Sequence, residues 1–117
     1  MSKLKDKIKA VQDVKSEKVT IPEWDVTVEL RTMKAIDRAK LLKDCVDKQG
    51  NVIGEKFQAG LIIASCFDPE TGERVFDNGD FDLLMDKAAG PIEELASTAM
   101  RISGLNRDTM TAIEKNS

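Results

Sequence analysis

The sequence predicts an α+β fold, mainly α, in which an N-terminal β-hairpin packs on a small helical bundle. Between Val19 and Leu30, apolar and polar residues alternate with a period of two, which is typical of strands with one buried face. After residue 32 the apolar residues instead recur every three to four positions, the period of an α-helix. Residues 59–67 carry no charge, although 33% of the chain is charged. This run is therefore expected at the centre of the core.

The first 18 residues are expected to form an extension to a single domain of residues 19–117. Leu4, Ile8 and Val11 lie at helical spacing with lysines between them, which predicts a weak amphipathic helix whose ends fray. Such a segment would either dock on a partner or remain a solvated extension.

The lysines between Lys3 and Lys9 interrupt any apolar run of the kind that a signal peptide requires. We therefore expect a cytoplasmic protein.

Composition argues against several classes of function. The 18 basic and 21 acidic residues give a net charge of -3, whereas a nucleic-acid-binding protein needs a basic surface. The chain has no histidine, and Cys45 and Cys66 are too few for a zinc site and are expected as reduced, buried thiols. Its longest uncharged run is far below the ~20 apolar residues that cross a bilayer. We expect no enzymatic activity, cofactor, metal, nucleic acid or membrane partner.

The hairpin is predicted to turn at Pro22, which cannot donate to a strand ladder. After this turn, Trp24, Val26, Val28 and Leu30 share one face of the second strand. Two strands alone are marginally stable, so this face must lie on something apolar. Trp24, the single tryptophan of the chain, is expected to be its structural anchor.

A helix is predicted from an N-cap at Thr32 to about Asp47. Its buried stripe would leave Leu41 aside and consist of Ala35, Ala39, Leu42 and Val46, flanked by Ile36 and Cys45. The segment from Glu55 to Phe67 is long enough for a helix of about three and a half turns. Its last residues favour extended structure and are expected to leave the helix as a strand.

The acidic segment after Phe67 is predicted to be a turn. Asp68 to Gly72 places proline and glycine in turn positions between two short apolar pieces, the second being Arg74 to Phe76. A calcium loop was the alternative, but oxygen ligands starting from Asp68 or Asp77 do not have the required spacing. Asp80 is then placed to cap a short helix.

The chain is predicted to finish in helices. One begins at Phe81 and stops at Gly90, and the next begins at Pro91 and ends at the stop residue Gly104. The second has an apolar face made of Ile92, Leu95, Ala96, Ala99 and Ile102. A last helix is predicted from a cap at Asn106, with Leu105 packing on Met110.

Four pieces of the chain together resemble a known family. They are residues 19–30 with their Pro-Glu-Trp-Asp turn, residues 68–76 closing on Arg-Val-Phe, the run Ile-Ser-Gly-Leu-Asn at 102–106, and Glu-Lys-Asn at 114–116. In this order they are similar to the tail assembly chaperones of long-tailed bacteriophages and prophages. The resemblance covers most of the chain from Val19 onward.

This resemblance implies a non-enzymatic protein of the infected host's cytoplasm that is absent from the mature virion. It would bind the tape measure protein and assist tail tube assembly, with the major tail tube protein as a further partner and self-association left open. The alternative is a minor structural or connector protein of the phage virion, which would co-purify with particles. For the client surface we predict Met100, Ile102, Met110 and Ile113. In a competing interpretation, the two methionines simply close the core between the last two helices.

Overall fold

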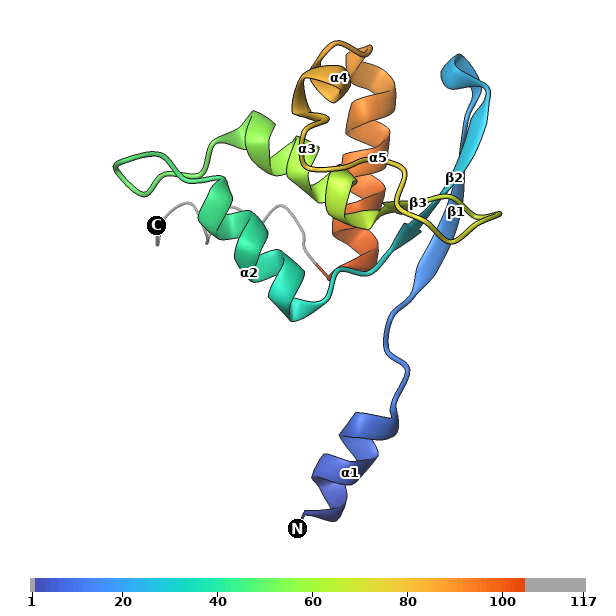
Figure 1. Ribbon diagram of the computed structural model, residues 1–117, viewed down its shortest axis with the longest axis vertical. Helices are drawn as coiled ribbons and strands as arrows, with labels where there is room; N and C mark the ends of the chain where they lie inside the picture. The colour runs from blue at the N-terminus through green and yellow to red at the C-terminus, as the bar shows by residue number, and fades with distance from the viewer. Residues whose placement is uncertain (1, 105–117) are drawn as a thin grey trace.

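A three-stranded antiparallel sheet lies beside a group of helices in the computed structural model, which describes residues 2–104 (Figure 1). The elements in chain order are α1 (Lys3–Ala10), β1 (Ser16–Ile21), the 3-10 turn η1 (Pro22–Trp24), β2 (Val26–Arg31), α2 (Ala35–Asp44), α3 (Gly54–Ser65), β3 (Cys66–Phe67), α4 (Phe81–Met85) and α5 (Ala89–Ile102). The sheet order is β1-β2-β3. The prediction of a mainly helical α+β fold is confirmed.

The predicted hairpin is present, with Val19 paired to Val28 and Ile21 to Val26. It begins three residues earlier than Val19, because the backbone of Ser16 pairs with Arg31 without needing an apolar side chain. Pro22 is the first residue of the connecting 3-10 turn. Proline has no backbone N–H, and at this position no strand residue needs one as a hydrogen-bond donor. Four side chains of the hairpin are buried: Val19, Ile21, Val28 and Leu30.

The tip of the hairpin is less buried than the alternation predicts. Val26 is 42% exposed and Trp24 is only half buried, although Trp24 packs on the edge of the core. Figure 1 shows the tip at the upper right, apart from the helices.

Replacing Trp24 by Ala is expected to lower the free energy of unfolding by about 2 kcal/mol, since about half of the ~3–5 kcal/mol of a fully buried tryptophan is at stake. Chemical denaturation monitored by circular dichroism measures the free energy of unfolding of both proteins. Tryptophan fluorescence cannot be used, because the variant lacks the single tryptophan. Val26→Ala, at the same tip, is the control and should cost under ~1 kcal/mol. A loss above ~3 kcal/mol for Trp24→Ala would instead place this side chain in the core.

Two predictions for α2 are wrong. The helix begins at Ala35 after Lys34, and Thr32 is not its cap: its hydroxyl accepts from Lys15 N at 3.0 Å and lies 3.1 Å from Ile102 O. The buried face of α2 also differs from the predicted stripe: Leu41, which the stripe left aside, is buried, whereas Ile36 is 59% exposed. Cys45 is buried as predicted. The remaining members of the stripe are exposed or half buried: Ala35, Ala39, Leu42 and Val46.

Gly60 explains which face of α2 is buried. A Cβ added there would lie 2.3 Å from Leu41 Cδ1, so the missing side chain on α3 makes the space that Leu41 occupies. The close approach of Leu41 to Gly60 places Leu41 on the side of α2 that faces α3. The apolar period of α2 itself cannot reveal this partner.

The central segment matches its prediction. Residues Gly54–Ser65 form α3, and the chain then leaves the helix as β3, where Cys66 pairs with Leu30 of β2. Ala59, Leu61 and Ile62 are completely buried. The helix thus lies between the sheet, α2 and α5, and it belongs to both groups of buried side chains that make up the core.

The acidic segment Asp68–Glu73, called the acidic turn below, is a turn as predicted. Asp68 N donates to Glu73 O and Gly72 N to Asp68 O, both at 2.8 Å, and Gly72 has a φ of +76°. Asp68 Oδ1 also accepts from Glu70 N at 2.8 Å. The Asp68 carboxylate therefore stabilises the turn.

The last described helices follow the prediction with shifted ends. Asp80 occupies the N-cap position of α4, but its carboxylate accepts from Asp77 N instead of the helix. α5 begins at Ala89, two residues before Pro91, because a proline fits anywhere in a first turn whose N–H groups have no helical partner. Gly104 follows the helix with a φ of +75°, the conformation that ends helices.

The buried face of α5 is confirmed for Ile92, Leu95, Ala96 and Ala99. Ile102 is half buried. The predicted helix from Asn106 and the contact between Leu105 and Met110 lie outside the described residues. Within residues 2–104, no helix is long and apolar enough to cross a membrane.

Candidate functional site

The features of the described residues that could bind a partner are one helix end and two grooves. No group of three or more His, Cys, Asp or Glu side chains within residues 2–104 is arranged to hold a metal ion. Cys45 and Cys66 are both buried free thiols. The expectation that the protein is not an enzyme stays a prediction.

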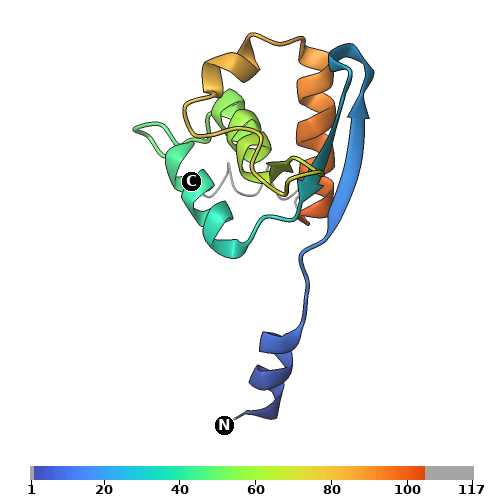
Figure 2. The ribbon, with the colours of Figure 1, turned by 45° about the vertical axis from the view of Figure 1, so that its right-hand side comes forward.

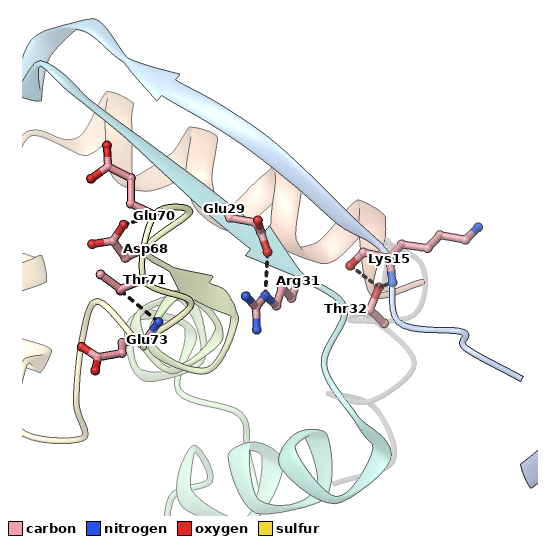
Figure 3. Close-up of polar contacts among 8 residues, drawn as sticks. All are labelled: Lys15, Glu29, Arg31, Thr32, Asp68, Glu70, Thr71 and Glu73. Atoms are coloured by element: carbon pink, nitrogen blue, oxygen red, sulfur yellow. Dashed lines mark hydrogen bonds and ion pairs between the residues drawn. The ribbon is translucent and has the colours of Figure 1, made fainter. Parts of the chain in front are cut away.

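Hydrogen bonds join the C-terminal end of α5 to the chain around β2. Thr32 Oγ1 lies 3.1 Å from Ile102 O, and Ser103 Oγ accepts from Met33 N at 3.1 Å. Arg101 pairs with Glu17 of β1 on the surface. Figure 3 shows Thr32 together with Lys15, whose backbone it also holds. The end of α5 is therefore fixed in position relative to the sheet.

Two of the predicted client-binding residues lie at this end of α5. Met100 is half buried against the group that contains Met33, Leu41 and Phe57, whereas Ile102 is half buried against the group around the sheet. Each of them therefore contributes to the core and keeps part of its surface available. Met110 and Ile113 lie outside the described residues, and the client role of all four stays a prediction.

A groove of about 780 Å³, the α2–α3 groove, lies between α2, α3 and the chain segment 74–81. Its apolar lining includes Leu41, Ile63 and Phe81. Three acidic and three basic residues surround it: Asp37, Asp44, Asp77, Lys40, Lys56 and Arg74. Its charge is balanced, so electrostatics favours neither an acidic nor a basic partner.

A second groove of about 610 Å³, the hairpin groove, lies between the hairpin tip and the acidic turn. Trp24, Val26 and Phe76 contribute to its apolar lining, and its charged lining residues are Asp68 and Glu70. From the sequence, Trp24 and the acidic turn were predicted as two unrelated features. The pairing of β3 with β2, which alternation in the hairpin could not show, brings them together.

The acidic turn is held against β2 by stacked cations. The Arg31 guanidinium lies 4.2 Å from the centre of the Phe67 ring, and that of Arg74 lies 5.5 Å from it. Arg31 also pairs with Glu29 at 2.6 Å, as Figure 3 shows. The wall of the hairpin groove that carries Asp68 and Glu70 is thereby anchored to the sheet.

Comparison with known proteins finds a similar fold among solved structures. No family model matches the sequence, and no curated protein matches it. Among solved structures, the chain is similar to the tail assembly chaperone of bacteriophage HK97, with a TM-score of 0.56 and 15% sequence identity. The two proteins share a fold. The predicted resemblance to the tail assembly chaperones is confirmed at that level.

The similarity extends over 86% of this chain and 98% of the HK97 chaperone. The HK97 protein therefore has almost no part without a counterpart here, and the match does not rest on one shared hairpin or helix pair. Because the sequence identity is low, the match shows that the helices and strands are arranged alike. It does not show that the two proteins share surface residues.

Proposed function

We propose that this protein is a phage tail assembly chaperone that binds the tape measure protein and assists assembly of the tail tube in the host cytoplasm. The observation that carries the proposal is the shared fold, which spans 98% of the HK97 tail assembly chaperone. The major tail tube protein is a second expected partner, and the chaperone itself does not remain in the finished virion.

The chemistry of the chain supports this role. A chaperone has to stay dissolved while it binds an apolar client, and one third of this chain is charged with an excess of acidic residues. Both grooves are lined by apolar and charged residues. Such surfaces suit recognition of a partner chain.

The end of α5 remains the proposed client surface. Methionine is unbranched and repacks at low cost, so a half-buried Met100 can adapt its exposed part to a partner. The hydrogen bonds of Thr32 and Ser103 hold this end of the helix still, which limits the entropy lost on binding. Ile102, Met110 and Ile113 complete the proposed surface.

The double variant Met100→Glu with Met110→Glu is expected to fold and to capture tape measure fragments at least about tenfold more weakly in a pull-down. Each glutamate places a charge that the apolar client would have to desolvate. Ser97→Glu, on the exposed side of the same helix, is the matched control and should bind normally.

Circular dichroism and thermal denaturation separate the outcomes. A double variant that unfolds would show that these methionines belong to the core. One that folds and still binds would show that the client binds another surface.

The overall role is tested on purified phage particles. A fixed number of copies of this chain per particle would contradict the chaperone and identify a structural or connector protein instead.

A further inference from the structure

We propose that α1 of one copy of this protein docks into the hairpin groove of a second copy, so that two chains exchange their N-terminal arms. The arm is residues 3–14, which comprise α1 and the linker to β1. This contact is separate from the client surface proposed on α5, and it does not depend on the identity of the client.

The arm presents an apolar face that nothing in its own domain covers. Leu4 is 67% exposed and Ile8 is 65% exposed, and α1 has no buried residue. Both Figure 1 and Figure 2 show α1 standing clear of the domain beyond the start of β1. An isolated helix of this length is marginal in water, so it needs a surface to pack on.

The hairpin groove holds a matching apolar surface. Ten large apolar side chains are exposed among residues 2–104, and six of them fall on these two surfaces. Leu4, Ile8, Val11 and Val14 lie on the arm, and Val26 and Val75 line the groove. Half-buried Trp24 and Phe76 extend the groove with aromatic area, which is enriched at protein interfaces.

Charge selects the hairpin groove over the α2–α3 groove. α1 contains four lysines and one aspartate, and at about 100° per residue the lysines flank the face formed by Leu4 and Ile8 on both sides. The charged residues that line the hairpin groove are the acidic Asp68 and Glu70, which Figure 3 shows next to each other on the acidic turn. The α2–α3 groove is charge-balanced and gives lysines no advantage.

The anchoring of the linker favours a second copy over the same chain. Lys15 N donates to Thr32 Oγ1 at 3.0 Å and Thr32 N donates to Lys15 O at 2.8 Å, which fixes Lys15 at the end of the hairpin opposite Trp24. The free linker Val11–Val14 spans at most ~14 Å. The strand from Lys15 to the tip rises ~20 Å in the other direction.

To enter its own groove, the arm would have to reverse direction within those four linker residues. Docking into a second copy requires no reversal, because the arm already points away from the domain. When each chain lends its arm to the other, the two contacts are equivalent and the dimer is closed.

Light scattering on the full chain after size-exclusion chromatography tests the proposal. The unchanged protein is expected to have twice the mass of one chain, and Ile8→Glu to halve it while the domain still unfolds cooperatively. Ala10→Glu adds the same charge on the far side of α1 and should keep the dimer. Glu70→Lys should shift the dimer toward monomer, because it removes an attraction to the lysines and adds a repulsion.

A mixing experiment identifies the exchange directly. Ile8→Glu damages the arm and Val26→Glu damages the groove, so each variant alone is expected to be monomeric. Mixed together, the intact arm of the Val26→Glu chain can enter the intact groove of the Ile8→Glu chain, and a mixed dimer should form. Labelling the two chains with different affinity tags detects it.

Three results would overturn the proposal. A full chain that is monomeric at every concentration would place the arm on its own domain or in solution. Dimers that survive Ile8→Glu would place self-association on another surface. A mixture that stays monomeric, although both variants still unfold cooperatively, would show that the arm does not bind the hairpin groove.

Discussion

Replacing Ile62 by Ala is expected to lower the free energy of unfolding by about 4 kcal/mol, in the upper part of the range for a buried isoleucine. Ile62 is completely buried in α3 and belongs to the core group formed with the sheet and α5. The loss has two parts, the apolar surface that is no longer buried and the cavity that the surrounding elements cannot fill. For a domain of this size the melting temperature should fall by roughly 20 °C.

Ile36→Ala is the matched control for Ile62→Ala. It removes the same atoms from a side chain that is 59% exposed, so it should change the free energy of unfolding by no more than ~0.5 kcal/mol. Urea denaturation of both variants measures the difference. If both variants lost the same free energy of unfolding, Ile36 would be buried, as its helical spacing predicted. That result would contradict the orientation of α2 in the structure.

The hairpin and α3 were predictable because their patterns are strong and local. Alternation at period two identified the strands, and an uncharged run framed by polar residues identified α3 and its exit into β3. The turn after Phe67 was equally readable, since Pro69 and Gly72 occupy positions that turns require. These elements depend on their own residues more than on distant contacts.

The orientation of α2 was not predictable, because a residue of another helix decides it. Gly60 on α3 leaves the space that Leu41 fills, and no periodicity within α2 carries that information. Thr32 shows the same limit. It has the chemistry of an N-cap, but it bonds to Lys15 and Ile102, which lie far from it in the sequence.

The candidate surfaces divide in the same way. The amphipathic pattern of α1 and the apolar arc of α5 could be read from spacing, and the structure places Met100 and Ile102 at the fixed end of α5. The hairpin groove could not be read, because it forms only when β3 pairs with β2 and brings the acidic turn beside Trp24. An amphipathic helix can be recognised from its own sequence, but a groove can be located only when the strand pairing that forms it is known.

The thiol of Cys66 is expected to react with iodoacetamide about a thousandfold more slowly in the native protein than in the unfolded chain at pH 8. Burial raises the pKa of Cys66 from 9.0 to about 12. Only the thiolate reacts, and at pH 8 its fraction falls from about one in ten to about one in ten thousand. Quenched labelling followed by mass spectrometry measures both rates. For Cys45, burial and then the Asp44 carboxylate raise the pKa to about 11, against the opposing Lys56 ammonium, so the slowing should be about a hundredfold.

The same shift predicts how stability changes in alkali. Because the native state holds the Cys66 proton to a higher pH than the unfolded chain, this stabilisation is complete below pH 9 and is lost as the pH rises from 9 toward 12. The free energy of unfolding should fall by up to about 1.4 kcal/mol per pH unit for this thiol. Cys66→Ala lowers stability at every pH by leaving a cavity, but its dependence on pH above 9 should be shallower by that amount. Parallel pH profiles for the two proteins, or equal labelling rates in the native and unfolded states, would show that the Cys66 thiol is not buried in the native protein.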